Sequence, residues 1–141
     1  MATSKAKATW EGGLKGGKGS MKPGSMDQPF PFSFGTRFEG DPGTNPEELV
    51  GAAHSGCFSM AFSKMAEDAG HPPKSVATTA DVHLEKKDDG FAITRIKLTM
   101  TADIPGMDKD QFDKLANQAK EGCPVSKALQ AVDIPLDATL K

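Results

Sequence analysis

The residues best suited to chemistry in this chain of 141 residues are its two cysteines. Cys57 lies in the apolar run 49–62, where we expect water to be scarce, and Cys123 directly precedes Pro124, where a helix is expected to start. Backbone N–H groups at a helix N-terminus favour a thiolate. Two thiols without an export segment favour redox chemistry over a disulfide scaffold. The alternatives are that Cys57 is a small core hydrophobe and that Cys123 only occupies a helix cap.

Arg37 and Glu47 are candidates for activating a thiol. Because an arginine carries a permanent charge on a rigid fork, Arg37 can stabilise a thiolate and contact a peroxide oxygen. Glu47 can orient Arg37 through a bidentate ion pair. Taken singly, Arg37 also fits a solvated arginine at a sheet edge. Glu47 equally fits an acidic residue that complements a helix dipole.

His54 stands three residues before Cys57, on the same face of an expected helix. This spacing is compatible with a base beside a nucleophile or with two metal ligands. A metal site needs further ligands, and neither His71 nor His83 has a matching spacing. We therefore expect a core or interface histidine, with no metal and no cofactor. The nucleophile-elbow motif of a serine hydrolase is also missing.

Length and charge limit the classes of function. The chain is long enough for one domain with a hydrophobic core. Its 17 basic and 19 acidic residues give a net charge of −2 and form no basic stripe, so no nucleic-acid partner is expected. No apolar stretch is long enough to span a membrane, and residues 1–8 lack the apolar segment of a signal peptide. We expect a cytoplasmic protein with no membrane partner.

Strand signals and turn residues alternate in the N-terminal part of the chain. A short strand is expected over 4–10, and the glycine-rich segment 12–19 is expected to be a hairpin turn or loop. In this segment Lys18 is followed by Gly19 rather than Ser or Thr, so it does not match a phosphate-binding Walker loop. Alternating phenylalanines predict an edge strand over 30–38.

A long helix is the clearest element that the sequence predicts. It is marked at its start by Asn45 as the cap and Pro46 as the first helical residue, and at its end, near residue 69, by Gly70. Residues 49–62 are apolar or small on nearly every face, so we expect this helix to be buried.

The remaining elements complete an α+β fold. A hairpin is expected over 75–87 and 91–104, with a bulge near Thr94 or Arg95 where the apolar alternation changes phase. Two helices follow, over about 108–121 and directly after Cys123, and 132–140 reads as a closing strand. We therefore expect an antiparallel sheet wrapped around a long, buried central helix.

With these motifs the chain resembles the OsmC/Ohr family of thiol-dependent peroxidases, and its OsmC branch in particular. The resemblance rests on the stretches 34–38 (Phe-Gly-Thr-Arg-Phe), 43–60 (which contains Asn-Pro-Glu-Glu-Leu and His-Ser-Gly-Cys-Phe) and 123–129 (Cys-Pro-Val-Ser-Lys-Ala-Leu). The order of strands and helices matches over essentially the whole chain. His54 favours the OsmC branch, because Ohr members tend to have an aromatic residue there.

The resemblance implies a single domain over 1–141 that forms an intertwined homodimer with two active sites at the subunit interface. It implies a peroxidase that reduces organic hydroperoxides to alcohols, with hydrogen peroxide a poorer substrate, in defence against oxidative or osmotic stress. Carried over to this sequence, Cys57 is the peroxidatic thiol, which becomes a sulfenic acid, and Cys123 is the resolving thiol. Arg37 and Glu47 are the activating pair. An external dithiol, of a small or lipoyl type, supplies electrons.

Helix geometry bears on this site independently. Glu47 and Cys57 are ten positions apart on one expected helix, which corresponds to about 15 Å along its axis. They can share a site only if Glu47 comes from a second subunit or if the helix breaks, for which Gly51 is a candidate. Antiparallel central helices in a dimer are the simpler arrangement.

Two other functions fit the same sequence: a non-redox dimer that binds a small apolar ligand or cleaves a thioester, and a structural dimer with inert cysteines. An apolar substrate pocket is also expected, with candidate lining residues Phe30, Phe32, Phe34, Phe58 and Met60.

Overall fold

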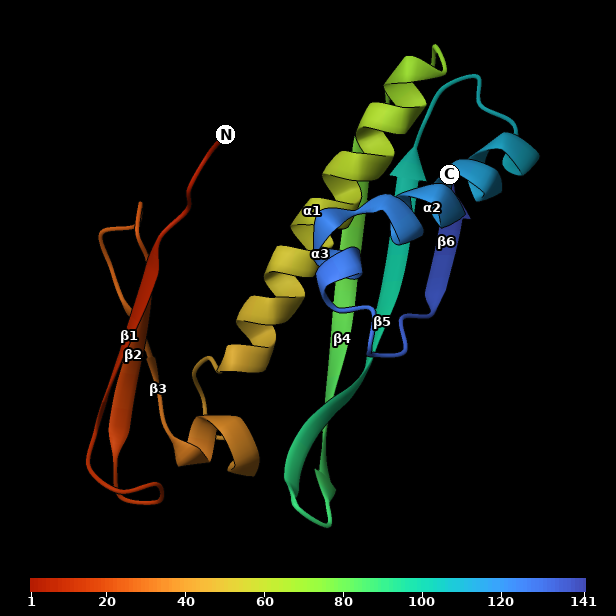
Figure 1. Ribbon diagram of the computed structural model, residues 1–141. Helices are drawn as coiled ribbons and strands as arrows, with labels where there is room; N and C mark the ends of the chain where they lie inside the picture. The colour runs from red at the N-terminus through yellow and green to blue at the C-terminus, as the bar shows by residue number, and fades with distance from the viewer. The chain divides into compact units, whose positions relative to one another are not determined.

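The N-terminal part of the chain forms a small antiparallel sheet in the computed structural model, which describes residues 1–141 (Figure 1). Its strands β1 (Ala6–Glu11), β2 (Lys18–Pro23) and β3 (Phe30–Phe32) pair in that order. Glu11 pairs with Lys18, so the glycine-rich segment between them is a hairpin turn, as predicted. Strand β2 is not evident from the sequence, because its glycine and lysine residues carry little strand propensity.

The chain forms a helical turn where its alternating phenylalanines predict a strand. Strand β3 ends at Phe32, and Gly35–Glu39 form a π-helical turn, η1. The backbone N–H of Ser33 donates to Thr36 Oγ1 (2.9 Å), and the N–H of Thr36 donates to Ser33 Oγ (3.1 Å). The prediction of a strand over 30–38 is therefore wrong beyond Phe32, because these local hydrogen bonds offer the backbone an alternative to a strand. Arg37 consequently lies on η1 rather than on a strand.

The long helix α1 (Pro46–Asp68) begins and ends as predicted. Asn45 Oδ1 accepts a hydrogen bond from the N–H of Glu48 (2.9 Å), which caps the first turn. Beyond the other end, Gly70 takes a left-handed conformation with φ +86°. There is no break at Gly51, and the helix is continuous between Glu47 and Cys57.

Helix α1 is buried on one side only. His54, Phe58, Phe62 and Ala66 are fully buried, as expected for a central helix. Another face is exposed in the single chain, and Met60 on it has a relative exposure of 77%. The expectation of burial on nearly every face is therefore not met by one copy of the chain. The exposed apolar or small residues of this face are Ala52, Ala53, Gly56 and Met60.

A second sheet contains β4 (Ser75–Lys87), β5 (Gly90–Asp103) and β6 (Leu136–Leu140). Strands β4 and β5 form the predicted antiparallel hairpin. Their register shifts between His83, which faces Arg95, and Leu84, which faces Ile93, so Thr94 is the extra residue of a bulge at the predicted place. The fold is α+β as expected, but β6 joins β5 in parallel, so this sheet is not antiparallel throughout as predicted.

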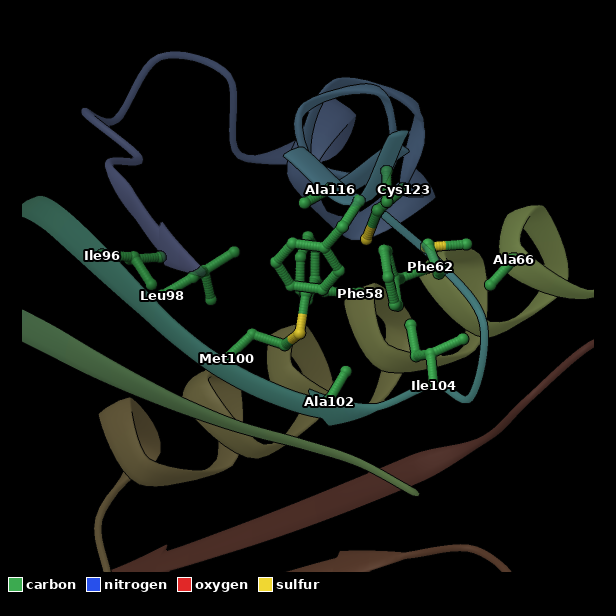
Figure 2. Close-up of a cluster of buried hydrophobic side chains, with 13 residues drawn as sticks. Phe58, Phe62, Ala66, Ile96, Leu98, Met100, Ala102, Ile104, Ala116 and Cys123 are labelled. Carbon is green, nitrogen blue, oxygen red and sulfur yellow. The ribbon is translucent and has the colours of Figure 1, made fainter. Parts of the chain in front are cut away.

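The hydrophobic core lies between α1, strand β5 and the helices α2 (Lys109–Gly122) and α3 (Pro124–Ala128) (Figure 2). The rings of Phe62 on α1 and Phe112 on α2 meet edge to face, with centroids 5.5 Å apart. Alternate β5 residues point into the same core, which fixes α1 against the sheet. They are Ile96, Leu98, Met100 and Ala102, all with 0% exposure.

The chain divides into two compact units, Met1–Leu49 and Val50–Lys141. Of the first unit only Gly35 and Glu47 are buried, so this unit has no apolar core of its own. None of the helices is both long and apolar enough to cross a membrane.

Candidate active site

The two cysteines lie next to each other although 66 positions separate them. Cys57 is on α1, and Cys123 is the residue between α2 and α3. Their sulfur atoms are 2.9 Å apart and share a hydrogen bond, and both thiols are free. Cys123 is fully buried in the core, whereas Cys57 is only partly buried. This reverses the expectation that Cys57 is the thiol remote from water, because the packing of α2 covers Cys123.

The surroundings shift the pKa values of the two thiols in opposite directions. Burial, and then the hydrogen bond with Cys123, raise the pKa of the Cys57 thiol. Burial acts in the same direction on Cys123, but its hydrogen bond with Cys57 and those from Ser126 and Val125 outweigh it and lower the pKa of the Cys123 thiol. Within Val50–Lys141, the surroundings therefore favour a thiolate on Cys123 over one on Cys57. A positive group beside Cys57 would act against its raised pKa.

His54 is a core histidine, one of the two roles expected of it. It has no exposed surface, and its Nε2 lies 2.7 Å from Ser126 Oγ. Burial lowers the pKa of His54, so the ring is neutral near pH 7. Ser126 is a site residue that the sequence reasoning missed. Its spacing of three from Cys123 was the available signal, because residues three apart share a helix face.

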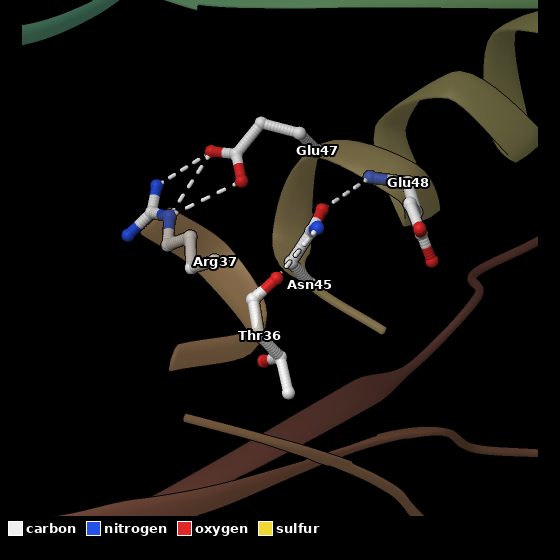
Figure 3. A network of polar contacts seen from close by, with 5 residues as sticks. All are labelled: Thr36, Arg37, Asn45, Glu47 and Glu48. Carbon is white, nitrogen blue, oxygen red and sulfur yellow. Dashed lines mark hydrogen bonds and ion pairs between the residues drawn. The ribbon is translucent and has the colours of Figure 1, made fainter. Parts of the chain in front are cut away.

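Arg37 and Glu47 form an ion pair within the first unit (Figure 3). Arg37 Nη2 donates to Glu47 Oε1 (2.6 Å), and Arg37 Nε donates to both carboxylate oxygens (3.1 and 3.2 Å). Glu47 is 7% exposed and so is a nearly buried carboxylate with a bound cation. Asn45 Nδ2 donates to the Thr36 carbonyl (3.2 Å), which ties η1 to the start of α1 and fixes the distance between the two charges.

An apolar cavity of about 300 Å³ opens beside Arg37 within the first unit. Of the expected lining residues, Phe32 and Phe34 line it and Phe30 does not. Phe58 is buried in the core of the other unit, and Met60 is exposed on α1. Sequence reasoning missed three further apolar lining residues, because they come from β1, the following hairpin and η1. These are Trp10, Leu14 and Phe38.

The rings of Trp10 and Phe32 meet across Gly19, with centroids 5.4 Å apart. A Cβ atom on Gly19 would lie only 2.6 Å from the Trp10 ring and 2.7 Å from the Phe32 ring. Glycine at this position therefore permits the two rings that form one wall of the cavity to close over the backbone.

The structure thus groups the predicted site residues in two pairs. Cys57 and Cys123 lie together in Val50–Lys141, and Arg37 and Glu47 lie together in Met1–Leu49. No group of three or more His, Cys, Asp or Glu side chains is arranged to hold a metal ion.

Comparison with known proteins gives matches over nearly the whole chain. The family model described as OsmC-like protein matches residues 38–137. The chain is 54% identical over 139 residues to peroxiredoxin OsmC of Escherichia coli K12, covering 97% of this chain and 96% of that protein. It is 30% identical to the organic hydroperoxide resistance protein OhrB of Bacillus subtilis 168, covering 97% and 98% of the two chains.

Solved structures show the same fold. The crystal structure of an organic hydroperoxide resistance protein OsmC from Legionella pneumophila superposes with a TM-score of 0.74 and 25% identity, covering 99% of this chain and 98% of the other.

Proposed function

Because the chain belongs to the OsmC family, we propose that it is a cysteine-based peroxidase that reduces organic hydroperoxides to alcohols with Cys57 as nucleophile and Cys123 as resolving thiol. The similar proteins named as a peroxiredoxin and as organic hydroperoxide resistance proteins support this activity. The single observation that carries it is the 2.9 Å separation of the two sulfurs. Two free thiols at this distance can form a disulfide with little backbone movement.

Exposure decides which sulfur meets the peroxide. Cys123 has no exposed surface, so a substrate cannot reach it before it reaches the partly buried Cys57. Gly56, which precedes Cys57 on α1, would have no atom within 4 Å of an added Cβ, so the helix surface beside this cysteine is open. Cys57 is therefore the peroxidatic cysteine in this proposal, although the pKa of its thiol is raised.

Arg37 is the group that offsets this raised pKa. Its Nε and Nη2 bind Glu47, which leaves Nη1 for a thiolate or a peroxide oxygen (Figure 3). An arginine held by a carboxylate cannot swing away, so its charge is preorganised where the reaction needs it. The apolar cavity beside Arg37 suits the organic part of the hydroperoxide, which favours an organic substrate over hydrogen peroxide.

The site requires two copies of the chain in this proposal. Glu47 and Cys57 are ten residues apart on the continuous helix α1, which corresponds to about 15 Å. Arg37, bound to Glu47, therefore meets Cys57 of a second copy. The two chains form a homodimer in which each of the two sites contains residues of both chains. The exposed face of α1 around Gly56 and Met60, and a first unit with no core of its own, both favour burial against another copy.

The chemistry then follows in three steps. The Cys57 thiolate attacks the terminal peroxide oxygen, the O–O bond breaks, and the departing alkoxide takes up a proton to leave as the alcohol. The Cys123 sulfur attacks the sulfenic acid on Cys57, and water leaves. An external dithiol, for example of a lipoyl type, reopens the disulfide by exchange and becomes a disulfide itself.

Thiol counting tests this proposal. Addition of one equivalent of an alkyl hydroperoxide to the reduced protein should remove both thiols. In the Cys57→Ser variant the remaining thiol should survive the peroxide. The Cys123→Ser variant should still consume peroxide and should accumulate a sulfenic acid on Cys57, which a specific trap labels. Survival of both thiols in the parent protein would mean that the protein is not a peroxidase. If the trap instead labelled a sulfenic acid on Cys123 in the Cys57→Ser variant, Cys123 would be the peroxidatic thiol and Cys57 the resolving one.

A further inference from the structure

His54 is a fully buried polar side chain for which the peroxidase steps give no role. Its Nε2 is 2.7 Å from Ser126 Oγ, while its Nδ1 is buried and has no hydrogen-bond partner. A buried ring with one unpaired nitrogen costs stability relative to an apolar side chain of the same shape. Its contact with Ser126 is therefore the feature that requires an explanation.

Ser126 connects His54 to the cysteine pair. The Ser126 hydroxyl lowers the pKa of the Cys123 thiol through a hydrogen bond to it, and Ser126, three residues further along the chain, is only 5% exposed. The Cys123 sulfur in turn lies 2.9 Å from that of Cys57. A continuous line of contacts thus runs from His54 on α1 to Ser126 on α3, then through Cys123 and back to α1 at Cys57.

The unpaired Nδ1 indicates the direction of these hydrogen bonds. Buried N–H groups without a partner are rarer than acceptors without one, so the ring proton belongs on Nε2. His54 Nε2 then donates to Ser126 Oγ, and this leaves the hydroxyl proton of Ser126 free to point at Cys123. In the opposite direction Ser126 would donate to His54 and could not donate to the sulfur.

We infer that His54 is a positioning residue for the resolving cysteine: by donating to Ser126 it orients the Ser126 hydroxyl toward Cys123 Sγ and so favours the thiolate that attacks oxidised Cys57. The inference concerns the second step of the proposed function and rests on that function only for its catalytic consequence. In that step a bond forms between the two sulfurs and the S–O bond of the sulfenic acid breaks. The proton lost by Cys123 ends on the departing hydroxide, which leaves as water, and His54 stays neutral throughout.

Among the groups near the two cysteines, Ser126 is the one whose side chain His54 can orient toward Cys123. Within Val50–Lys141, the hydrogen-bonding groups that shift the pKa of Cys123 are Cys57 on α1 and Val125 and Ser126 on α3. The charged side chains near Ser126 line a surface cleft of about 380 Å³ that this serine touches. They are Lys120, Glu121, Lys127 and Asp133. All of them are unchanged in the variants below, so they cannot produce a difference between those variants.

Titration of a single thiol tests the inference without any peroxidase activity. In the Cys57→Ser background, the ultraviolet absorbance of the Cys123 thiolate is followed against pH. Ser126→Ala and His54→Phe should each raise the pKa of Cys123 by about one unit, which is a tenfold loss of thiolate below that pKa. His54→Gln should retain most of the parent value, because its amide keeps an N–H donor. Combining His54→Phe with Ser126→Ala should add nothing to Ser126→Ala alone.

The inference is overturned if Ser126→Ala leaves the Cys123 pKa unchanged, or if His54→Phe shifts it equally with and without Ser126. Ser126→Ala is a small change that keeps the test available if the buried His54→Phe variant does not fold. In the chain with both cysteines, Ser126→Ala should slow disulfide formation about tenfold at neutral pH and increase trapped sulfenic acid. If no peroxide is consumed even by the parent, the proposed function fails while the titration still decides the inference.

Discussion

Arg37 is held by Glu47 through contacts of 2.6, 3.1 and 3.2 Å, and the two residues lie ten positions apart in the first of the two units of the chain. The cation is therefore built and oriented separately from the sulfur that it is proposed to activate. The surroundings of Cys57 raise the pKa of its thiol. Loss of the Arg37–Glu47 ion pair should therefore reduce activity more than loss of an ordinary surface salt bridge would.

Removing the carboxylate should slow oxidation of Cys57 without unfolding the protein. Glu47→Gln frees the guanidinium from its fixed position, and we expect a rate about tenfold lower, which corresponds to about one unit in the Cys57 pKa. Arg37→Lys should oxidise no faster than Glu47→Gln, because an ammonium group cannot bind a carboxylate through two N–H groups as a guanidinium does. Stopped-flow measurement of sulfenic-acid formation gives the rates. Glu48→Gln is the matched control, because Glu48 is exposed and contacts Thr44 rather than Arg37. Equal rates for the two glutamine variants would remove Glu47 from the site.

Mixed dimers should show whether Arg37 and Cys57 act across two chains. Arg37→Ala and Cys57→Ser homodimers should each be inactive in peroxide turnover. If the site is shared, unfolding and refolding the two variants together should restore about one quarter of the parental sites, because half of the dimers are mixed and each has one intact site. A site formed within one chain would give no recovery. Size-exclusion chromatography with light scattering should confirm that the species present is a dimer.

The cavity beside Arg37 should control the preference for organic substrates. Gly19→Ala places a methyl group against the rings of Trp10 and Phe32, so the wall of the cavity must shift. We expect a higher KM for bulky alkyl hydroperoxides and little change for hydrogen peroxide. Gly16→Ala is the control from the same hairpin, because an added Cβ there meets nothing within 4 Å. A parallel loss for both peroxides with Gly19→Ala would point to a general defect instead.

Stability should fall as the solution is acidified because of His54. Burial lowers the pKa of His54 in the folded chain below its unfolded value of about 6.5, so the unfolded chain binds more protons in that range. The stability that the neutral ring contributes is complete above the unfolded pKa and is lost as pH falls from there through the folded pKa. Urea unfolding at several pH values should show this slope, and His54→Gln should flatten it whatever its overall stability. An unchanged slope would contradict the assignment.

Local signals determined much of this protein before any tertiary contact is considered. Asn45 and Pro46 define the start of α1, and the phase change near Thr94 defines the bulge, because capping and strand alternation depend on neighbouring residues only. The motifs around Cys57 and Cys123 likewise identified the family. Local signals failed at Arg37, where the reciprocal hydrogen bonds of Ser33 and Thr36 produced a helical turn instead of a strand.

Only the tertiary structure decided how the two cysteines differ. Whether a side chain is buried depends on segments distant in sequence, and here the approach of α2 and α3 to α1 buries Cys123 and leaves Cys57 partly exposed. The same packing brings Ser126 against His54, a contact across 72 positions that no local pattern encodes. The sequence by itself therefore specified most of the elements and the two cysteines, and the packing of distant elements decided which thiol is partly exposed and which is buried behind it.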